Sequence, residues 1–321
     1  MILVNTLKFL FLMLLINVFI SLFGPKNTLP GVAAAVGLMT FPALDLEIKP
    51  FSMALLIFSF YTLSGLAAQS VFAPPLLGFI INFAFVLLLL IFTSEPAAYK
   101  IYMPMLLAFI FGQSVPVSGQ DFILRMEGLI LSGIIIALST VIMWKLKGFG
   151  KGAKPLKEQI AASKNYKGFI LRLSVGIALA MLIGTLLNLQ KPLWISIVVM
   201  SLTQIELQDT ITRIKHRTIA TFVGIAVFIV FFHFLIPPQY HIFLILLIGY
   251  LNNFVKEYKY QQILNAVNAI NASLILLDTS TAIKDRLLCL AAGIFIVLMF
   301  YGLHFLTRYL LNRRQTKPKN L

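Results

Sequence analysis

Long apolar runs, separated by short segments that contain Pro, Gly, Asn or charged residues, follow one another along the whole chain. Runs of roughly 17 to 25 apolar residues are typical of helices that cross a bilayer. In the first half the pattern predicts helices at residues 5–24, 28–45, 51–72, 76–93, 101–115 and 122–145. In the second half it predicts helices at residues 167–187, 192–208, 215–236, 240–255, 261–278 and 284–308. We therefore expect an all-α integral membrane protein with about twelve transmembrane helices, and the shorter runs leave ten or eleven spans as an alternative.

Composition supports the membrane class. Of the 321 residues, 60% are hydrophobic and 12% are charged, whereas about a quarter of the residues in an average soluble domain are charged. The single cysteine, Cys289, excludes an intrachain disulfide and a cysteine-based metal site. The first apolar segment, 7–23, is followed by no signal-peptide cleavage pattern, so we expect it to remain as a membrane helix.

The positive charge of the chain indicates orientation in a membrane. The net charge is +15, but the lysines and arginines lie between apolar runs and not on an amphipathic soluble surface, which disfavours nucleic acid as a partner. Lys and Arg accumulate on the cytoplasmic side of membrane proteins. We therefore expect a first membrane repeat at 1–146, a basic cytoplasmic linker at 147–166, a second membrane repeat at 167–308 and a basic cytoplasmic tail at 309–321.

The two halves also resemble each other. At an offset of 161 residues several similar side chains coincide in order, among them the pairs Asn27 and Asn188, Asp45 and Glu206, and Arg125 and Arg286. Ordered matches of this kind indicate a duplication. Because each unit has an even number of helices, we expect two parallel six-helix repeats with the substrate pathway between them.

Residues 210–224, with the sequence TITRIKHRTIATFVG, combine basic side chains with regular spacing beside an apolar run. Arg213 and Arg217 are four residues apart, so both face one side of a helix, and Thr210 and Thr221 extend the same face. Two guanidinium groups on one face can bind a carboxylate through paired hydrogen bonds. The alternative is that they anchor the helix end at lipid headgroups.

This segment resembles the signature of the fusaric acid resistance (FUSC) family, which is related to the aromatic acid exporters. The matching positions are Thr210, Arg213, Arg217, Ala220, Thr221 and Gly224, with Trp194 upstream as the family's aromatic residue. Ala220 stands where the family usually has Gly, and the corresponding part of the first half, 49–65, has no arginine pair. The resemblance implies a multi-pass protein of the bacterial inner membrane that is associated with export of aromatic or other organic acids.

Under this interpretation Arg213, Arg217, Thr210, Thr221 and Trp194 are candidate substrate-binding residues. The expected partners are the lipid bilayer, a small organic anion and, in an export assembly, a periplasmic adaptor subunit. The oligomeric state stays open.

Three further polar residues are weaker candidates. Glu206 follows the apolar run WISIVVMSLTQI, where a desolvated carboxylate would hold a proton more readily and carry a coupling proton; capping the next helix or pairing with a lysine are the alternatives. Asn265 and Asn268 share a face of the eleventh predicted helix, where they either line a polar passage or form interhelical hydrogen bonds.

Motifs for enzymatic chemistry are missing from the sequence. It contains no phosphate-binding loop, nucleophile elbow or His-Glu zinc motif, so we expect no catalytic residues, no metal and no cofactor. Energy for transport would come from a gradient or a partner. The leading hypothesis is an exporter of an amphipathic, aromatic organic acid. The alternatives are a passive organic-anion channel and a non-transporting scaffold or accessory subunit of an envelope assembly.

Overall fold

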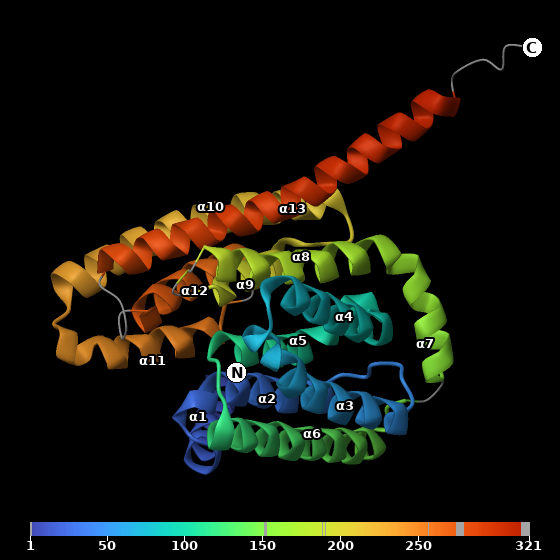
Figure 1. The fold of residues 1–321 in the computed structure, drawn as a ribbon. Coiled ribbons are helices and arrows are strands. Elements are labelled where there is room, and N and C mark those ends of the chain that lie inside the picture. The colour runs from blue at the N-terminus through green and yellow to red at the C-terminus, as the bar shows by residue number, and fades with distance from the viewer. Residues whose placement is uncertain are drawn as a thin grey trace, which may run out of the picture.

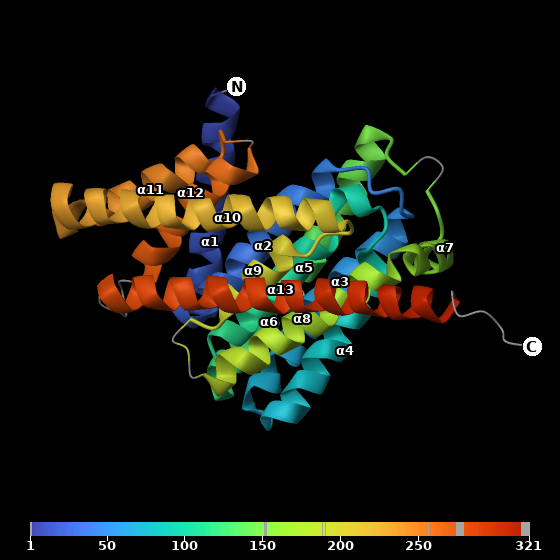
Figure 2. The same cartoon turned by 90° about the horizontal axis from the view of Figure 1, so that it is seen from above.

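The protein is a bundle of α-helices stacked in layers (Figure 1). The computed structural model describes residues 2–150, 153–187, 189, 191–255, 257–273 and 279–315. Helix α6 forms the outermost layer on one side, while α10 and α13 form it on the other. Both views show α10 and α13 running antiparallel, with their axes nearly aligned, on the same side of the molecule (Figures 1 and 2). In the described part of the chain, β-structure is limited to an isolated bridge between Ile48 and Lys154.

Six α-helices make up the first half. They are α1 (Ile2–Phe23), α2 (Thr28–Thr40), α3 (Pro50–Ala67), α4 (Pro75–Thr93), α5 (Tyr102–Ser114) and α6 (Gly119–Lys147). Short 3₁₀ turns lie at Pro25–Asn27, Phe41–Ala43, Ala68–Phe72 and Ala97–Tyr99. Pro50 and Pro75 open α3 and α4, where proline's missing N–H costs no helical hydrogen bond.

Seven α-helices follow. They are α7 (Leu156–Ser163), α8 (Lys167–Leu186), α9 (Leu193–Leu202), α10 (Leu207–Phe228), α11 (His241–Asn252), α12 (Tyr258–Ser273) and α13 (Thr279–Gln315). Short 3₁₀ turns lie at Lys164–Tyr166 and Pro238–Tyr240, and a π-helical segment, Ile229–Leu235, continues α10. The twelve helices expected from the sequence correspond to α1–α6 and α8–α13, whereas α7 lies in the linker and was not expected.

The largest difference from the expected boundaries lies around the basic segment. The sequence predicted one helix to residue 208 and the next from 215, but α9 ends at Leu202 and α10 begins at Leu207. The physical reason is the extended backbone between them, which begins at Thr203 with ψ 112°. Arg213 therefore lies two turns inside a long helix and not in a connecting segment. The end of the expected helix 261–278 lies partly outside the described residues.

The predicted membrane class is confirmed. Among the described residues, seven helical segments are long and apolar enough to cross a membrane: Ile2–Phe23, Pro50–Phe72, Pro75–Thr93, Gly119–Lys147, Leu156–Leu186, Leu207–Phe232 and Thr279–Leu303. Helices α5, α9 and α11 are apolar but shorter. Many large apolar side chains remain exposed, for example Leu7 at 57% and Leu14 at 59% on α1, as expected for surfaces that face lipid.

The linker is attached to the loop between α2 and α3. Trp144, which is fully buried near the end of α6, donates a hydrogen bond of 3.0 Å to the carbonyl of Phe41. The backbone N–H of Lys154 donates to the carbonyl of Glu47 at 3.0 Å, and the Gln159 side chain donates to the same oxygen at 3.4 Å. Figure 1 shows α7 standing across the end of the bundle at which α6 ends and α8 begins.

Candidate functional site

The four-residue loop Thr203–Glu206, between α9 and α10, is the centre of a polar cluster. Tyr301 of α13 donates a hydrogen bond of 2.7 Å to the carbonyl of Gln204, and its hydroxyl lies 2.8 Å from the hydroxyl of Thr210. The N–H of Gln204 donates to that Thr210 oxygen at 3.2 Å. Thr210 is fully buried, so this candidate substrate-binding residue fixes the loop.

Cationic side chains from three helical segments surround this loop. Lys100, which follows the 3₁₀ turn before α5, donates to Gln204 Oε1 at 3.0 Å. Arg172 of α8 donates to the carbonyls of Gln204 and Ile205 at 3.2 and 3.1 Å. Arg213 donates to the carbonyl of Ser201 at 3.3 Å, and its guanidinium lies 4.6 Å from the ring centroid of Tyr258.

A cavity of about 340 Å³ opens beside these groups. It is lined by Ser94, Ala97, Ala98, Lys100 and Tyr102 from the first half and by Phe169, Gln204, Ile205, Asp209 and Arg213 from the second half. This volume falls in the usual range of small-ligand sites. Residues from both halves thus form one cavity.

The lining of this cavity suits a small organic anion. Two cationic side chains, Lys100 and Arg213, face one carboxylate, Asp209. The rings of Tyr102 and Phe169 form an aromatic wall, with centroids 6.0 Å apart. The Ser94 hydroxyl is buried and has no hydrogen-bond partner among the described residues. Together these groups offer charge, a ring-binding surface and a free donor.

Lys100 is a titratable group of this cavity whose environment changes its pKa. Burial lowers the pKa of Lys100, the nearby positive charge of Arg213 lowers it further, and Asp209 opposes both effects. Its backbone adopts a left-handed conformation with φ 47°, which is uncommon for a residue other than glycine. An anion in the cavity would relieve the repulsion between Lys100 and Arg213.

Arg217 lies next to Arg213 on the inner face of α10. Its side chain is 2% exposed, and Nη1 donates to the hydroxyl of Ser201, whose carbonyl binds Arg213. Its Nε has no acceptor among the described residues. The structure therefore brings both arginines together at one residue of α9. Arg217 is buried and does not reach lipid headgroups, whereas Arg213 is partly exposed.

Trp194 does not join this pair. It lies at the other end of α9, seven positions from Ser201, which corresponds to about 10 Å along a helix. Its ring faces a different arginine, Arg286 of α13, whose guanidinium lies 4.6 Å from the ring centroid. The proposed grouping of Trp194 with Arg213 is thus not found in the structure.

The remaining candidates have local partners or exposed positions. Thr221 is buried and donates to the carbonyl of Arg217 at 2.9 Å, a hydrogen bond within its own helix. Glu206 is exposed at the N-cap position of α10 and makes no side-chain cap hydrogen bond, so its role in proton coupling stays a prediction. Asn265 accepts a hydrogen bond of 3.2 Å from Asn252, while Asn268 Oδ1 is buried without a partner among the described residues.

Arg125 is a buried arginine whose environment the sequence did not reveal. Asp121, four residues earlier in the sequence, pairs with Lys26 at 2.8 Å and not with Arg125. Arg125 is 1% exposed and donates to Asn27 Oδ1 at 2.7 Å, and to the carbonyls of Gly112 and Val115 at 2.6 and 2.8 Å. These carbonyls lie at the end of α5, so Arg125 caps that helix.

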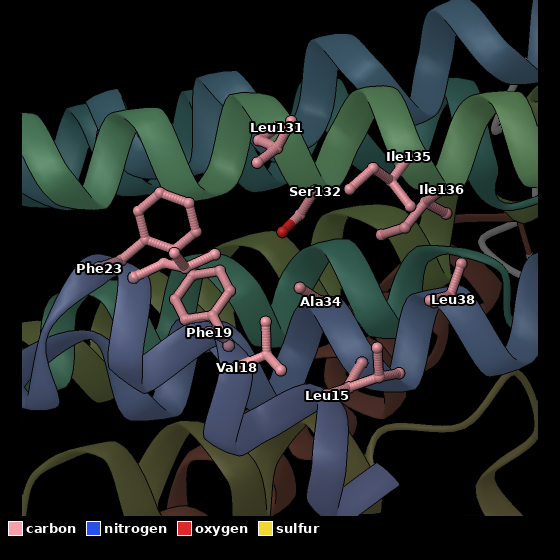
Figure 3. A pocket seen from close by; sticks show the side chains of 13 residues that line it. Leu15, Val18, Phe19, Phe23, Ala34, Leu38, Leu131, Ser132, Ile135 and Ile136 are labelled. Atoms are coloured by element: carbon pink, nitrogen blue, oxygen red, sulfur yellow. The ribbon is translucent and has the colours of Figure 1, made fainter. Parts of the chain in front are cut away.

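A second cavity, of about 110 Å³, lies between α1, α2 and α6 (Figure 3). Leu15, Phe19 and Ile135 are among the side chains that line it, and Ser132 is the polar one. It carries no charged group. Its lining suits apolar material, so the charged cavity at Lys100 and Arg213 is the better candidate for a functional site.

Comparisons with known proteins give a family match for part of the second half. Residues 179–300, which include α9 to α12, match the family model described as fusaric acid resistance protein-like. The family predicted from residues 210–224 is confirmed for this segment. The chain is also 41% identical over 76 residues to "Uncharacterized protein YhfK" of Escherichia coli (strain K12), and this match covers 24% of the chain and 11% of the relative. No solved structure matches the chain.

Proposed function

We propose that this membrane protein, in which residues 179–300 form a fusaric acid resistance protein-like domain, transports a small aromatic or amphipathic organic acid across the bacterial inner membrane. The observation that carries the proposal is the cavity of about 340 Å³ with Lys100 and Arg213 on its wall. The carboxylate of the substrate binds these two cations, and its ring packs against Tyr102 and Phe169.

The position of the cavity between the two halves supports transport over simple binding. Its lining comes from the turn before α5, from α8 and from the start of α10. If the halves are two parallel repeats, a relative movement of the repeats changes the width of this cavity and exposes it to alternate sides. The duplication itself is supported by Arg125 and Arg286, which match at an offset of 161 residues and are both buried, at 1% and 5% exposure.

In the proposed orientation the basic linker, the basic tail and the cavity face the cytoplasm. Lys100, Arg213 and Lys215 then lie on the side at which lysine and arginine accumulate. An organic anion produced in the cell enters here, so we propose export as the direction. A periplasmic adaptor subunit would complete an export assembly on the other side.

Uptake of labelled benzoate into proteoliposomes tests the proposal. Lys100→Gln and Arg213→Gln each remove one charge-assisted hydrogen bond, which contributes about 1.5–3 kcal/mol when fully formed. Because both side chains are partly exposed, we expect the lower end of this range, a half-saturating concentration roughly tenfold higher. Lys215→Gln is the matched control, since Lys215 is an exposed cation on α10 outside the cavity.

The same preparation separates the alternatives. A passive channel carries benzoate current in planar bilayers without a proton gradient, whereas a coupled exporter needs one. A scaffold moves no benzoate under either condition. Uptake that responds equally to Lys100→Gln and Lys215→Gln would show that the cavity is not the substrate site.

A further inference from the structure

Three arginines lie at successive depths beside α9. Arg213 contacts the carbonyl of Ser201, and Arg217 contacts the hydroxyl of the same residue. Arg286 of α13 lies over Trp194, near the opposite end of α9. Of the three, only Arg213 lines the cavity described above. The other two continue from the cavity into the interior of the second half.

Arg217 and Arg286 are both buried without a complete set of partners. Arg217 is 2% exposed and Arg286 is 5% exposed. Arg217 Nε, Arg286 Nε and Arg286 Nη1 have no hydrogen-bond acceptor among the described residues. A buried guanidinium that leaves donors unpaired costs several kcal/mol unless a ligand supplies acceptors.

No carboxylate lies within ion-pair distance of Arg217 or Arg286 in the described part of the chain, where the ion pair found joins Lys26 to Asp121. Asp285, a buried residue next to Arg286 in sequence, offsets part of the positive charge of Arg286 from a longer distance. The positive charge of Arg217 acts unfavourably on that of Arg286. The corresponding arginine of the first half, Arg125, has its donors occupied by Asn27 and by carbonyls at the end of α5. Unlike Arg125, Arg286 therefore retains N–H donors without hydrogen-bond acceptors among the described residues.

We propose that Arg217 and Arg286 form a buried anion-binding site, beyond the cavity at Lys100 and Arg213, that takes a compact negative group. That group is either a small inorganic anion or the carboxylate of the transported acid. The Trp194 ring closes the site at Arg286 through its cation–π contact. This proposal rests on the proposed function only where the occupant is the transported acid.

Trp194 can serve as a fluorescence probe of this site. The chain has two tryptophans, Trp144 and Trp194. Trp144 is fully buried in the first half, whereas Trp194 lies 4.6 Å from the Arg286 guanidinium. Iodide quenches tryptophan fluorescence on contact, so iodide bound at Arg286 should quench Trp194. The measurement uses purified full-length protein, both as wild type and with Trp144→Phe, at constant ionic strength with gluconate as the replacement anion.

We expect quenching that saturates with iodide concentration. Arg286→Gln and Arg217→Gln should each raise the half-saturating concentration at least tenfold. Lys284→Gln, which removes an exposed cation from the same helix, should leave it unchanged. Quenching that rises linearly with iodide, and equally in wild type and Arg286→Gln, would overturn the proposal. If Arg286→Gln does not fold, the test uses Arg286→Lys and the shape of the wild-type quenching curve, in which saturation supports the proposal and linearity overturns it.

Competition identifies the occupant. Displacement of iodide by chloride but not by benzoate assigns the site to a small inorganic anion, and displacement by benzoate assigns it to the carboxylate of the transported acid. The outcome is separable from that of the proposed function. Linear quenching together with normal benzoate uptake removes this site alone, whereas saturable quenching without uptake removes transport alone.

Discussion

Lys100 and Gln204 are joined by a hydrogen bond of 3.0 Å between Nζ and Oε1. This contact links the turn before α5, in the first half, to the loop before α10, in the second. The Lys100 ammonium therefore joins the two halves at the cavity wall. The same group can also bind an anion. A movement that separates the halves at this end must break this hydrogen bond.

Anion affinity should fall as the pH rises through the pKa of Lys100. Burial and the charge of Arg213 lower that pKa, so the ammonium loses its proton at a lower pH than an ordinary lysine. The charged form of Lys100 binds the anion, so the anion affinity is highest below the lowered pKa and decreases above it. By linkage a bound anion raises the pKa, so binding takes up protons. Calorimetric titration of benzoate in buffers of different ionisation enthalpy measures this uptake.

Lys100→Arg is the control for this pH dependence. Arginine stays protonated over the accessible range, so the variant should retain affinity at high pH and lose the proton uptake. An unchanged alkaline limb in Lys100→Arg would assign the pH dependence to another group.

Tyr301→Phe should loosen the loop between α9 and α10. The change leaves the carbonyl of Gln204 without the 2.7 Å hydrogen bond from the Tyr301 hydroxyl, and it removes a partner of Thr210. Arg172 still donates to this carbonyl, so we expect the loss of one net hydrogen bond, about 0.5–1.5 kcal/mol, and thermal unfolding in detergent should show it. Tyr99→Phe, at a ring that is 40% exposed, is the comparison and should be neutral.

Gly224→Ala should force α10 away from α12. A Cβ atom at Gly224 would lie 2.6 Å from the Cβ of Ala266 and 3.1 Å from the carbonyl of Ile263, and neither neighbour is a flexible side-chain end. Overpacking of this kind costs about 1–3 kcal/mol. Gly302→Ala places its Cβ where nothing lies within 4 Å. A similar loss of stability in both variants would contradict the close packing at Gly224.

Arg125→Gln should destabilise the first half. The substitution withdraws the donors that satisfy the carbonyls of Gly112 and Val115 and the amide oxygen of Asn27. We expect a loss of about 1–3 kcal/mol for each acceptor left unpaired, seen as a lower midpoint of thermal unfolding. Arg286→Gln, at the corresponding position, removes a charge with unpaired donors and should cost less in anion-free buffer.

The helical class could be predicted because a membrane leaves few options for the backbone. Apolar runs must form helices there, and the runs are long and clearly separated by polar residues. The loop before α10 could not be predicted in the same way. Its extended conformation depends on a hydrogen bond from Tyr301, about a hundred residues later in the chain. The local sequence pattern does not indicate that partner.

The site was only partly visible in the sequence. The spacing of Arg213 and Arg217 placed both on one face of a helix, because four-residue spacing on a helix is a local property, and Arg213 lines the cavity. The other cavity residues lie in segments whose local patterns indicate only helix ends and apolar faces. Tertiary packing brings Lys100, Tyr102 and Phe169 to the cavity. The sequence did not indicate that Trp194 lies against Arg286, since its position along α9 decides which helix it faces.

The start of α10 at the cavity wall has a kinetic consequence. The first turn of a helix carries N–H groups without acceptors, which place partial positive charge at that end. Here that end lies beside Lys100 and Arg213. Their combined field should steer anions toward the opening, so the association rate constant should fall as ionic strength rises while the dissociation rate constant changes little. Stopped-flow binding at several salt concentrations would measure the two separately.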